Sequence, residues 1–144
     1  SSDVCSSDLV QSQLVSLITE GTLEVHPGVK VAVLEAGFTW IGPFLWRFDK
    51  EWRNLRRLVP WVRRPPSAYL RDHFRFTIQP LDAPDRNDHL LQAIDQIGSE
   101  HVLMYSSGYP HRHASDPDRL LNIVPAQLAD RIRADNAKAL YGLP

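Results

Sequence analysis

The sequence has almost no cysteine, since Cys5 is the only one in 144 residues. A single cysteine excludes an internal disulfide framework and a structural zinc site built from cysteines alone. No apolar run approaches the roughly 18 residues of a transmembrane helix, and the N-terminal residues lack the basic-then-apolar order of a secretion signal. Gly-rich phosphate loops, His-Glu-x-x-His and G-x-S-x-G motifs are also absent from the sequence. We therefore predict a cytoplasmic protein that has no membrane partner.

Neither sign of charge is in clear excess, since 16 Lys and Arg residues stand against 17 Asp and Glu residues. This balance gives no general reason to expect nucleic acid as a partner. One local cluster is both basic and aromatic: Trp52, Arg53, Arg56, Arg57, Trp61, Arg63 and Arg64. It could hold phosphates and stack bases. The apolar spacing of Phe48, Trp52 and Leu55 favours a solvated helix face whose tryptophans pack inward, so we predict no nucleic-acid partner.

Residues 1–9 form an imperfect Ser-Ser-Asp repeat without a helical or strand period. They resemble the translation of a DNA sequencing-library adapter, so we expect a disordered scar that carries no fold information. An ordinary disordered tail is the alternative. The first interpretation makes residues 10–144 the C-terminal piece of a longer protein.

Apolar spacing from residue 10 onward predicts helices that alternate with three short strands. The expected strands are Val29–Leu34, His73–Gln79 and His101–Ser106. The first expected helix starts at Val10 and has about four turns, and the second begins near Pro43. A short helix capped by Ser67 is expected to end at Arg71. Further helices are expected over Leu90–Ile97, around Asp118–Leu121 and over Pro125–Leu140. This alternation is typical of an α/β fold with a parallel sheet. Ligands of such sheets collect at the carboxyl ends of the strands, which directs attention to residues 35–37, 79–80 and 106–113.

Three motifs in these regions resemble one known family. The first spans Gly21 to Gly37 and continues with Trp40, Pro43, Arg47 and Asp49; the second is Ser106-Ser107-Gly108-Tyr109-Pro110-His111; the third is Asp135-Asn136-Ala137-Lys138-Ala139-Leu140-Tyr141-Gly142-Leu143. Their order is similar to that in the amidohydrolase-related metal-dependent hydrolases, in the branch that includes aminocarboxymuconate semialdehyde decarboxylase. The resemblance covers nearly all of residues 10–144.

The resemblance implies the C-terminal part, about three β/α units, of a TIM-type (β/α)8 barrel, which needs about 250 residues when complete. The expected strands would be barrel strands six, seven and eight. The family's His-x-His pair after strand one and its histidine after strand five belong to units that are missing here. The full-length parent would be a metal-dependent hydrolase or decarboxylase that binds a divalent metal, zinc by this resemblance, and acts on a small carboxylated or cyclic molecule.

Several residues are candidates for the site of that parent. Glu35 could be a metal ligand, a substrate contact or a partner of Arg47, and the resemblance makes it a catalytic and metal-binding candidate. His111 matches the family motif and would line the active site, with Tyr109 at the substrate mouth. His113 is a further mouth candidate, although an exposed loop position is the favoured interpretation. Gly108 stands where the family has an aspartate that contacts the metal and shuttles a proton.

This glycine supports an alternative function from a different class: a non-catalytic fragment or degenerate member that serves as a structural or association module. We expect the isolated chain to be inactive and to hold no cofactor. The uncovered sheet edges of this chain, at Val29–Leu34 and Val102–Ser106, favour self-association, for example into a homo-oligomer.

Overall fold

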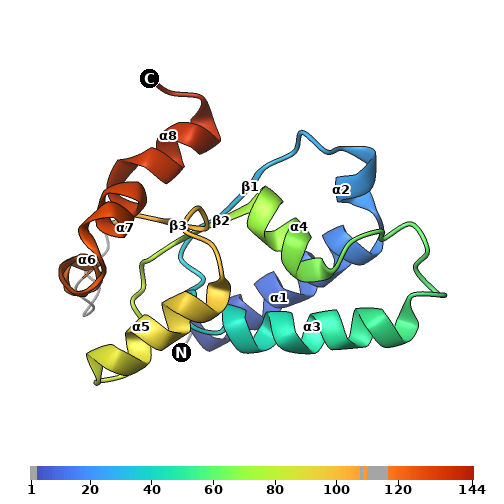
Figure 1. Cartoon of the computed structure of the whole chain (residues 1–144), viewed down its shortest axis with the longest axis horizontal. Coiled ribbons are helices and arrows are strands. Elements are labelled where there is room, and N and C mark those ends of the chain that lie inside the picture. The colour runs from blue at the N-terminus through green and yellow to red at the C-terminus, as the bar shows by residue number, and fades with distance from the viewer. Residues whose placement is uncertain (1–2, 108, 110–116) are drawn as a thin grey trace.

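The computed structural model describes residues 3–107, 109 and 117–144, and in this part of the chain three strands form one parallel sheet (Figure 1). The strands lie side by side in chain order: β1 (Val31–Val33), β2 (Phe74–Thr77) and β3 (Leu103–Met104). In their register, Val31 pairs with Phe74 and Phe76 pairs with Leu103. The predicted parallel α/β arrangement is confirmed, although each strand is shorter than the run that predicted it.

Helices lie before, between and after the strands. The chain begins with α1 (Asp3–Thr19) and α2 (Thr22–Val25), and the connections between strands contain α3 (Ile41–Leu55), α4 (Pro66–His73) and α5 (Asn87–Ile97). After β3 come α6 (Pro117–Ile123), α7 (Ala126–Asp130), the π-helix η1 (Arg131–Asp135) and α8 (Asn136–Tyr141). Figure 1 shows α6, α7 and α8 beyond β3, away from α2 and α4. None of the described helices is long and apolar enough to cross a membrane.

The core lies between the sheet and the helices that connect its strands. Along β2, Phe74 and Phe76 alternate with Arg75 and Thr77, so the two aromatic side chains share one face. Both are buried, and Trp40 meets Phe76 edge-to-face with ring centroids 5.8 Å apart. The same hydrophobic cluster includes Ile41, Leu45, Leu90, Ile94 and Val102. Because this face is covered by helices, it fixes the strand register and therefore the relative positions of the strand ends.

The first helix begins at Asp3, whereas the apolar period that predicted it begins at Val10. The expectation of disorder over residues 1–9 therefore does not hold for residues 3–9, which are helical. A nucleated helix gains one backbone hydrogen bond for each added residue without needing an apolar face. The adapter origin of the segment stays a prediction.

The start of α4 differs from the prediction in its capping residue. Pro65 is extended and Pro66 occupies the first turn, and the predicted cap by Ser67 is wrong because no local side chain caps this helix. Instead, the Ser67 backbone N–H donates to Oδ1 of Asp49 on α3 at 2.9 Å. Pro66 has no N–H, so this carboxylate serves an early free amide of the helix. Asp49 of the first motif therefore has a structural role.

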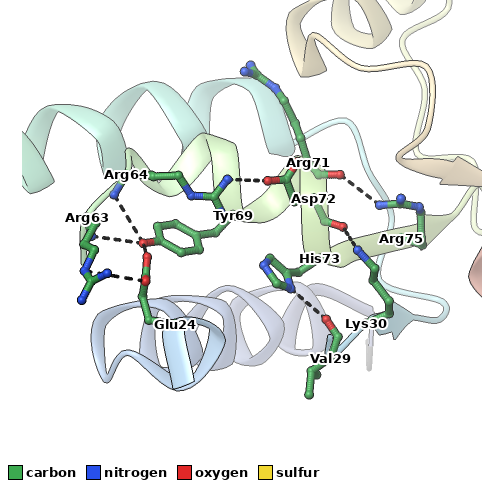
Figure 2. A network of polar contacts seen from close by, with 10 residues as sticks. All are labelled: Glu24, Val29, Lys30, Arg63, Arg64, Tyr69, Arg71, Asp72, His73 and Arg75. Atoms are coloured by element: carbon green, nitrogen blue, oxygen red, sulfur yellow. Dashed lines mark hydrogen bonds and ion pairs between the residues drawn. The ribbon is translucent and has the colours of Figure 1, made fainter. Parts of the chain in front are cut away.

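Tyr69 of α4 is the centre of a polar network that ties this helix to α2 (Figure 2). Its hydroxyl donates to Oε1 of Glu24 and accepts hydrogen bonds from the backbone N–H groups of Arg63 and Arg64, at 3.1 and 3.3 Å. Burial is the main cause that raises the pKa of Tyr69 above its ordinary value, and the Glu24 hydrogen bond adds to it. The Arg64 guanidinium lies over the Tyr69 ring at 4.6 Å and pairs with Asp72 at 2.6 Å.

Two further contacts join α4 to the chain that leads into β1 (Figure 2). Lys30 donates from Nζ to the Asp72 carbonyl at 2.7 Å, and Nδ1 of the buried His73 lies 2.8 Å from the Val29 carbonyl oxygen. No role was predicted for His73, and the structure shows that it links α4 to the chain before β1 at the amino ends of the strands, opposite the edge where ligands collect.

The C-terminal helical segment is anchored to β3 by Asn136. This residue is 2% exposed, and its Nδ2 donates to the carbonyls of Glu100 and Leu103, both at 2.8 Å. Just beyond β3, the Tyr105 N–H donates to the Ile132 carbonyl of η1 at 2.7 Å. The single helix predicted here is thus interrupted by a π turn at the place where the segment meets the sheet.

Candidate functional site

The carboxyl ends of all three strands meet at an open cleft of about 400 Å³. The cleft is lined by residues that end or follow each strand: Leu34, Glu35, Thr77, Tyr105, Ser106, Ser107 and Tyr109. A parallel sheet brings the carboxyl ends of its strands to one edge, so residues far apart in the sequence share this hollow. The structure therefore brings together the first and last of the regions that the sequence indicated.

Glu35 has an uncommon backbone conformation at the edge of this cleft. Its φ is 56°, in the left-handed region that residues with a Cβ rarely adopt. Its N–H donates to Oγ1 of Thr77 at 3.0 Å, and the Thr77 hydroxyl donates to the Gln79 carbonyl at 3.3 Å. These bonds hold the ends of β1 and β2 together and help to maintain the turn. Such a conformation costs about 1–2 kcal/mol and is found preferentially at functional sites.

The two residues after Glu35 keep this turn rigid. Gly37 has a φ of 65°, and a Cβ at this position would lie 2.9 Å from Oδ2 of Asp82, so only glycine fits without strain. Trp40 donates from Nε1 to the Ala36 carbonyl at 3.0 Å. The exposed Glu35 side chain is therefore presented by a fixed loop at the cleft.

The β3 side of the cleft supplies hydroxyl groups. Oγ of Ser106 is buried and finds no hydrogen-bond partner among the described residues. A buried hydroxyl without a partner costs about 1–3 kcal/mol, a cost that a hydrogen bond from a ligand at this end of the cleft would relieve. Ser107 accepts a 3.3 Å hydrogen bond from the Tyr109 N–H, and the Tyr109 side chain is 88% exposed at the rim.

The structure decides one of the three roles that the sequence left open for Glu35. Within the described residues, Glu35 forms no ion pair with Arg47, which lines a separate groove between α1 and α3. The interpretation of Glu35 as a partner of Arg47 is wrong, and the roles as ligand and substrate contact stay predictions. Gly108, His111 and His113 lie outside the described residues, so their predicted roles also remain predictions.

Sequence reasoning gave no individual role to two residues that the cleft brings together. Thr77 ends β2 on the face opposite Phe76, and Ser106 follows β3 in the second motif. The strict alternation along β2 was a usable signal for Thr77, because it placed a polar side chain at the carboxyl end of the strand. The lack of a hydrogen-bond partner for the Ser106 hydroxyl results from tertiary packing, so it could not be predicted from the sequence.

The cluster of arginines and tryptophans lies on α3 and the chain after it, and none of its residues lines this cleft. Trp52 is half-buried and donates from Nε1 to the Val62 carbonyl at 3.1 Å. Trp61 donates to the Thr19 carbonyl at 2.7 Å but is 48% exposed. The prediction that the tryptophans pack inward is confirmed for Trp52 only.

A family model described as amidohydrolase matches residues 4–143. The chain belongs to the amidohydrolase family. The family predicted from the three motifs is therefore confirmed. A search of curated proteins gives no match.

Solved structures of the amidohydrolase fold resemble this chain. The 5-carboxyvanillate decarboxylase LigW from Sphingomonas paucimobilis has 20% identity and a TM-score of 0.71, over 90% of this chain and 38% of that chain. The amidohydrolase map2389c from Mycobacterium avium subsp. paratuberculosis K-10 has 20% identity and a TM-score of 0.72, over 96% and 34%. A dihydroxybenzoic acid decarboxylase from Polaromonas sp. JS666, solved with manganese and 2-nitroresorcinol, has 18% identity and a TM-score of 0.66, over 94% and 40%.

The chain spans between 34% and 40% of the length of these three structures. Their similarity confirms the predicted fold class, part of a TIM-type barrel with three parallel strands in the described residues. In such barrels the active site lies at the carboxyl ends of the strands, where the Glu35 cleft is found.

A divalent metal is the cofactor expected for this family, and it needs several ligand side chains close together. Across the residues that the structure describes, no three His, Cys, Asp or Glu side chains lie together in a way that could hold a metal ion. Glu35 is the only residue of these types that lines the described cleft. A catalytic metal site usually takes three protein ligands, so the described residues do not fit a metal by themselves.

Proposed function

We propose that this chain supplies part of the active site of an amidohydrolase-family enzyme that decarboxylates or hydrolyses a small carboxylated or cyclic compound. The observation that carries this proposal is the cleft at the carboxyl ends of the three strands, which contains both the strained Glu35 turn and the orphaned Ser106 hydroxyl. Decarboxylases of carboxyvanillate and dihydroxybenzoate among the similar structures favour an aromatic carboxylate as the substrate.

The charges of the side chains indicate which substrate groups the two sides of the cleft would contact. Glu35 would repel a substrate carboxylate when ionised, so its carboxylate is better suited to a substrate hydroxyl or a metal ion. Ser106 can donate its unused hydroxyl proton to a substrate oxygen. Tyr109 and His113 would lie at the mouth and His111 would line the site, as the sequence predicts.

Any metal would be held by the whole enzyme, with Glu35 as one ligand beside others that the described residues do not provide. Zinc is the metal that the family resemblance implies, and manganese is present in two of the similar structures. We expect the isolated chain to bind divalent metal no better than about millimolar, which corresponds to about 4 kcal/mol. We also keep the cytoplasm as the proposed location.

The alternative is a non-catalytic association module. It is supported by Gly108 in place of the family's aspartate and by β1 and β3, which are the two edges of the described sheet. Gly108→Asp in the whole protein separates the two functions. A large gain in turnover means that Gly108 disabled a working site, whereas no gain points to a scaffold.

The direct test uses the protein encoded by the complete gene, assayed with Mn²⁺ or Zn²⁺ for release of CO₂ from 2,6-dihydroxybenzoate and 5-carboxyvanillate. Glu35→Gln should lower kcat/KM by at least about tenfold, the size of effect typical of groups around a metal. Glu51→Gln is the matched control, because Glu51 is an exposed carboxylate on α3 outside the cleft. Equal activity of both variants, or upstream sequence that lacks a His-x-His pair after a first strand, would contradict the proposal.

A further inference from the structure

A second hollow, of about 720 Å³, lies at the C-terminal end of α3 and shares no residue with the strand-end cleft. Its lining consists of Arg53, Asn54, Arg56, Arg57, Pro60, Val62 and Arg63. The last turn of α3 forms one wall, and the chain that turns back toward α4 forms the other. The arginines that the sequence placed on a solvated helix face therefore border a concave surface.

The charge of this surface is of one sign. Four guanidinium groups line it, and none of its described lining residues is a carboxylate. Among the described residues, Arg53, Arg56 and Arg57 form no ion pair, and Arg63 lies 4.0 Å from Glu24 at the limit of one (Figure 2). By contrast, Arg64, Arg86 and Arg131 each have a carboxylate oxygen within 3.1 Å. Uncompensated positive charge is thus concentrated in this hollow although the chain as a whole carries −1.

The walls of the hollow are held in place by internal contacts. The Arg56 guanidinium lies 5.2 Å from the centre of the Trp52 ring, and that indole donates to the carbonyl of Val62. Val62 is 4% exposed, so the second wall is anchored in the core. The Arg63 backbone N–H is fixed by the Tyr69 hydroxyl (Figure 2). Of the four arginine side chains, that of Arg56 is held by this ring contact, so it loses less freedom when it binds a ligand.

We propose that this arginine pocket binds a small soluble polyanion that carries two or three phosphate groups. Planar guanidinium groups match phosphate oxygens in paired hydrogen bonds, and several phosphates are needed to neutralise four positive charges. The volume lies within the range of about 300–1,000 Å³ that is usual for small-molecule sites.

Nucleic acid fits the pocket less well. Single-stranded sites combine basic grooves with aromatic rings on which bases stack. Here Arg56 already lies over the Trp52 ring, and Trp61 is not among the lining residues. The described pocket therefore offers donors for phosphates but no free stacking surface.

The test is calorimetric titration of the full chain with tripolyphosphate at 50 and 200 mM NaCl, conditions that reveal the salt dependence of phosphate contacts. The double variant Arg53→Gln/Arg57→Gln should bind at least about tenfold more weakly, which corresponds to the loss of one charge-assisted contact. Arg133→Gln/Lys138→Gln removes the same charge from exposed positions on η1 and α8, outside the pocket, and should change the affinity less than about twofold. Circular dichroism confirms that both variants are folded.

Three results would overturn the proposal. Absence of binding at 50 mM NaCl would remove it, and equal weakening in both double variants would mean that only general charge attracts the anion. Tighter binding of a single-stranded oligonucleotide that competes with tripolyphosphate would assign the pocket to nucleic acid instead. None of these outcomes depends on the activity proposed for the strand-end cleft.

Discussion

Asn136→Asp should destabilise the protein strongly although it changes only one group of the side chain. The Asn136 amide donates to the Glu100 and Leu103 carbonyls, and the residue is 2% exposed. A carboxylate at this position has no proton for either carbonyl. Each of the two unsatisfied partners costs about 1–3 kcal/mol, so we expect a loss of about 2–6 kcal/mol out of a total stability of about 5–15 kcal/mol.

The assay is urea unfolding at pH 7 followed by tryptophan fluorescence. Asn122→Asp is the matched control, because Asn122 is exposed on α6 and the same change there should cost less than about 0.5 kcal/mol. Burial and the facing carbonyls raise the folded-state pKa of the introduced carboxyl. Its penalty should therefore be smallest below the unfolded pKa and grow as pH rises toward the folded pKa. Similar losses at both positions would refute the role of Asn136 as the anchor of α8 to β3.

Three further outcomes follow from the fold. Gly37→Ala should cost about 1–2 kcal/mol because of its positive φ, while Gly28→Ala, where a Cβ meets nothing within 4 Å, should be nearly neutral in thermal unfolding. Asp49→Ala should cost about 1 kcal/mol in urea unfolding by leaving the Ser67 N–H uncapped, whereas an unchanged midpoint would refute the cap. Because the pKa of Tyr69 is raised in the folded state, its contribution to stability is complete below the ordinary value of 10.0 and is lost as pH rises through the folded pKa. Tyr69→Phe should abolish this alkaline loss in a pH series of unfolding curves, and persistence of the loss would contradict the assignment.

The sequence allowed the three strands and their parallel order to be predicted because β-branched and alternating apolar runs are local signals. It did not allow their ends to be predicted. The predicted run from Val29 to Leu34 is paired only over Val31–Val33. The Asp49 cap of α4 was likewise beyond local patterns, because it depends on how α3 packs against α4.

The candidate site was predicted in part. Glu35 could be selected by its place after a strand and by its motif, and the structure puts it in the strand-end cleft. Its left-handed backbone could not be foreseen, since glutamate, unlike aspartate or asparagine, is not enriched at positive φ. The hydrogen bond between its N–H and Thr77 joins residues 42 positions apart and arises only from the strand register.

The most direct test of the central claim is a crystal structure of the whole protein with Mn²⁺ and 2-nitroresorcinol, the pair present in the Polaromonas structure. Anomalous scattering would locate the metal independently of the organic ligand. We expect the inhibitor to lie in the cleft between Glu35, Thr77 and Ser106, with the Glu35 carboxylate in contact with the metal or with a ligand hydroxyl. An inhibitor bound elsewhere, with Glu35 touching neither group, would contradict it.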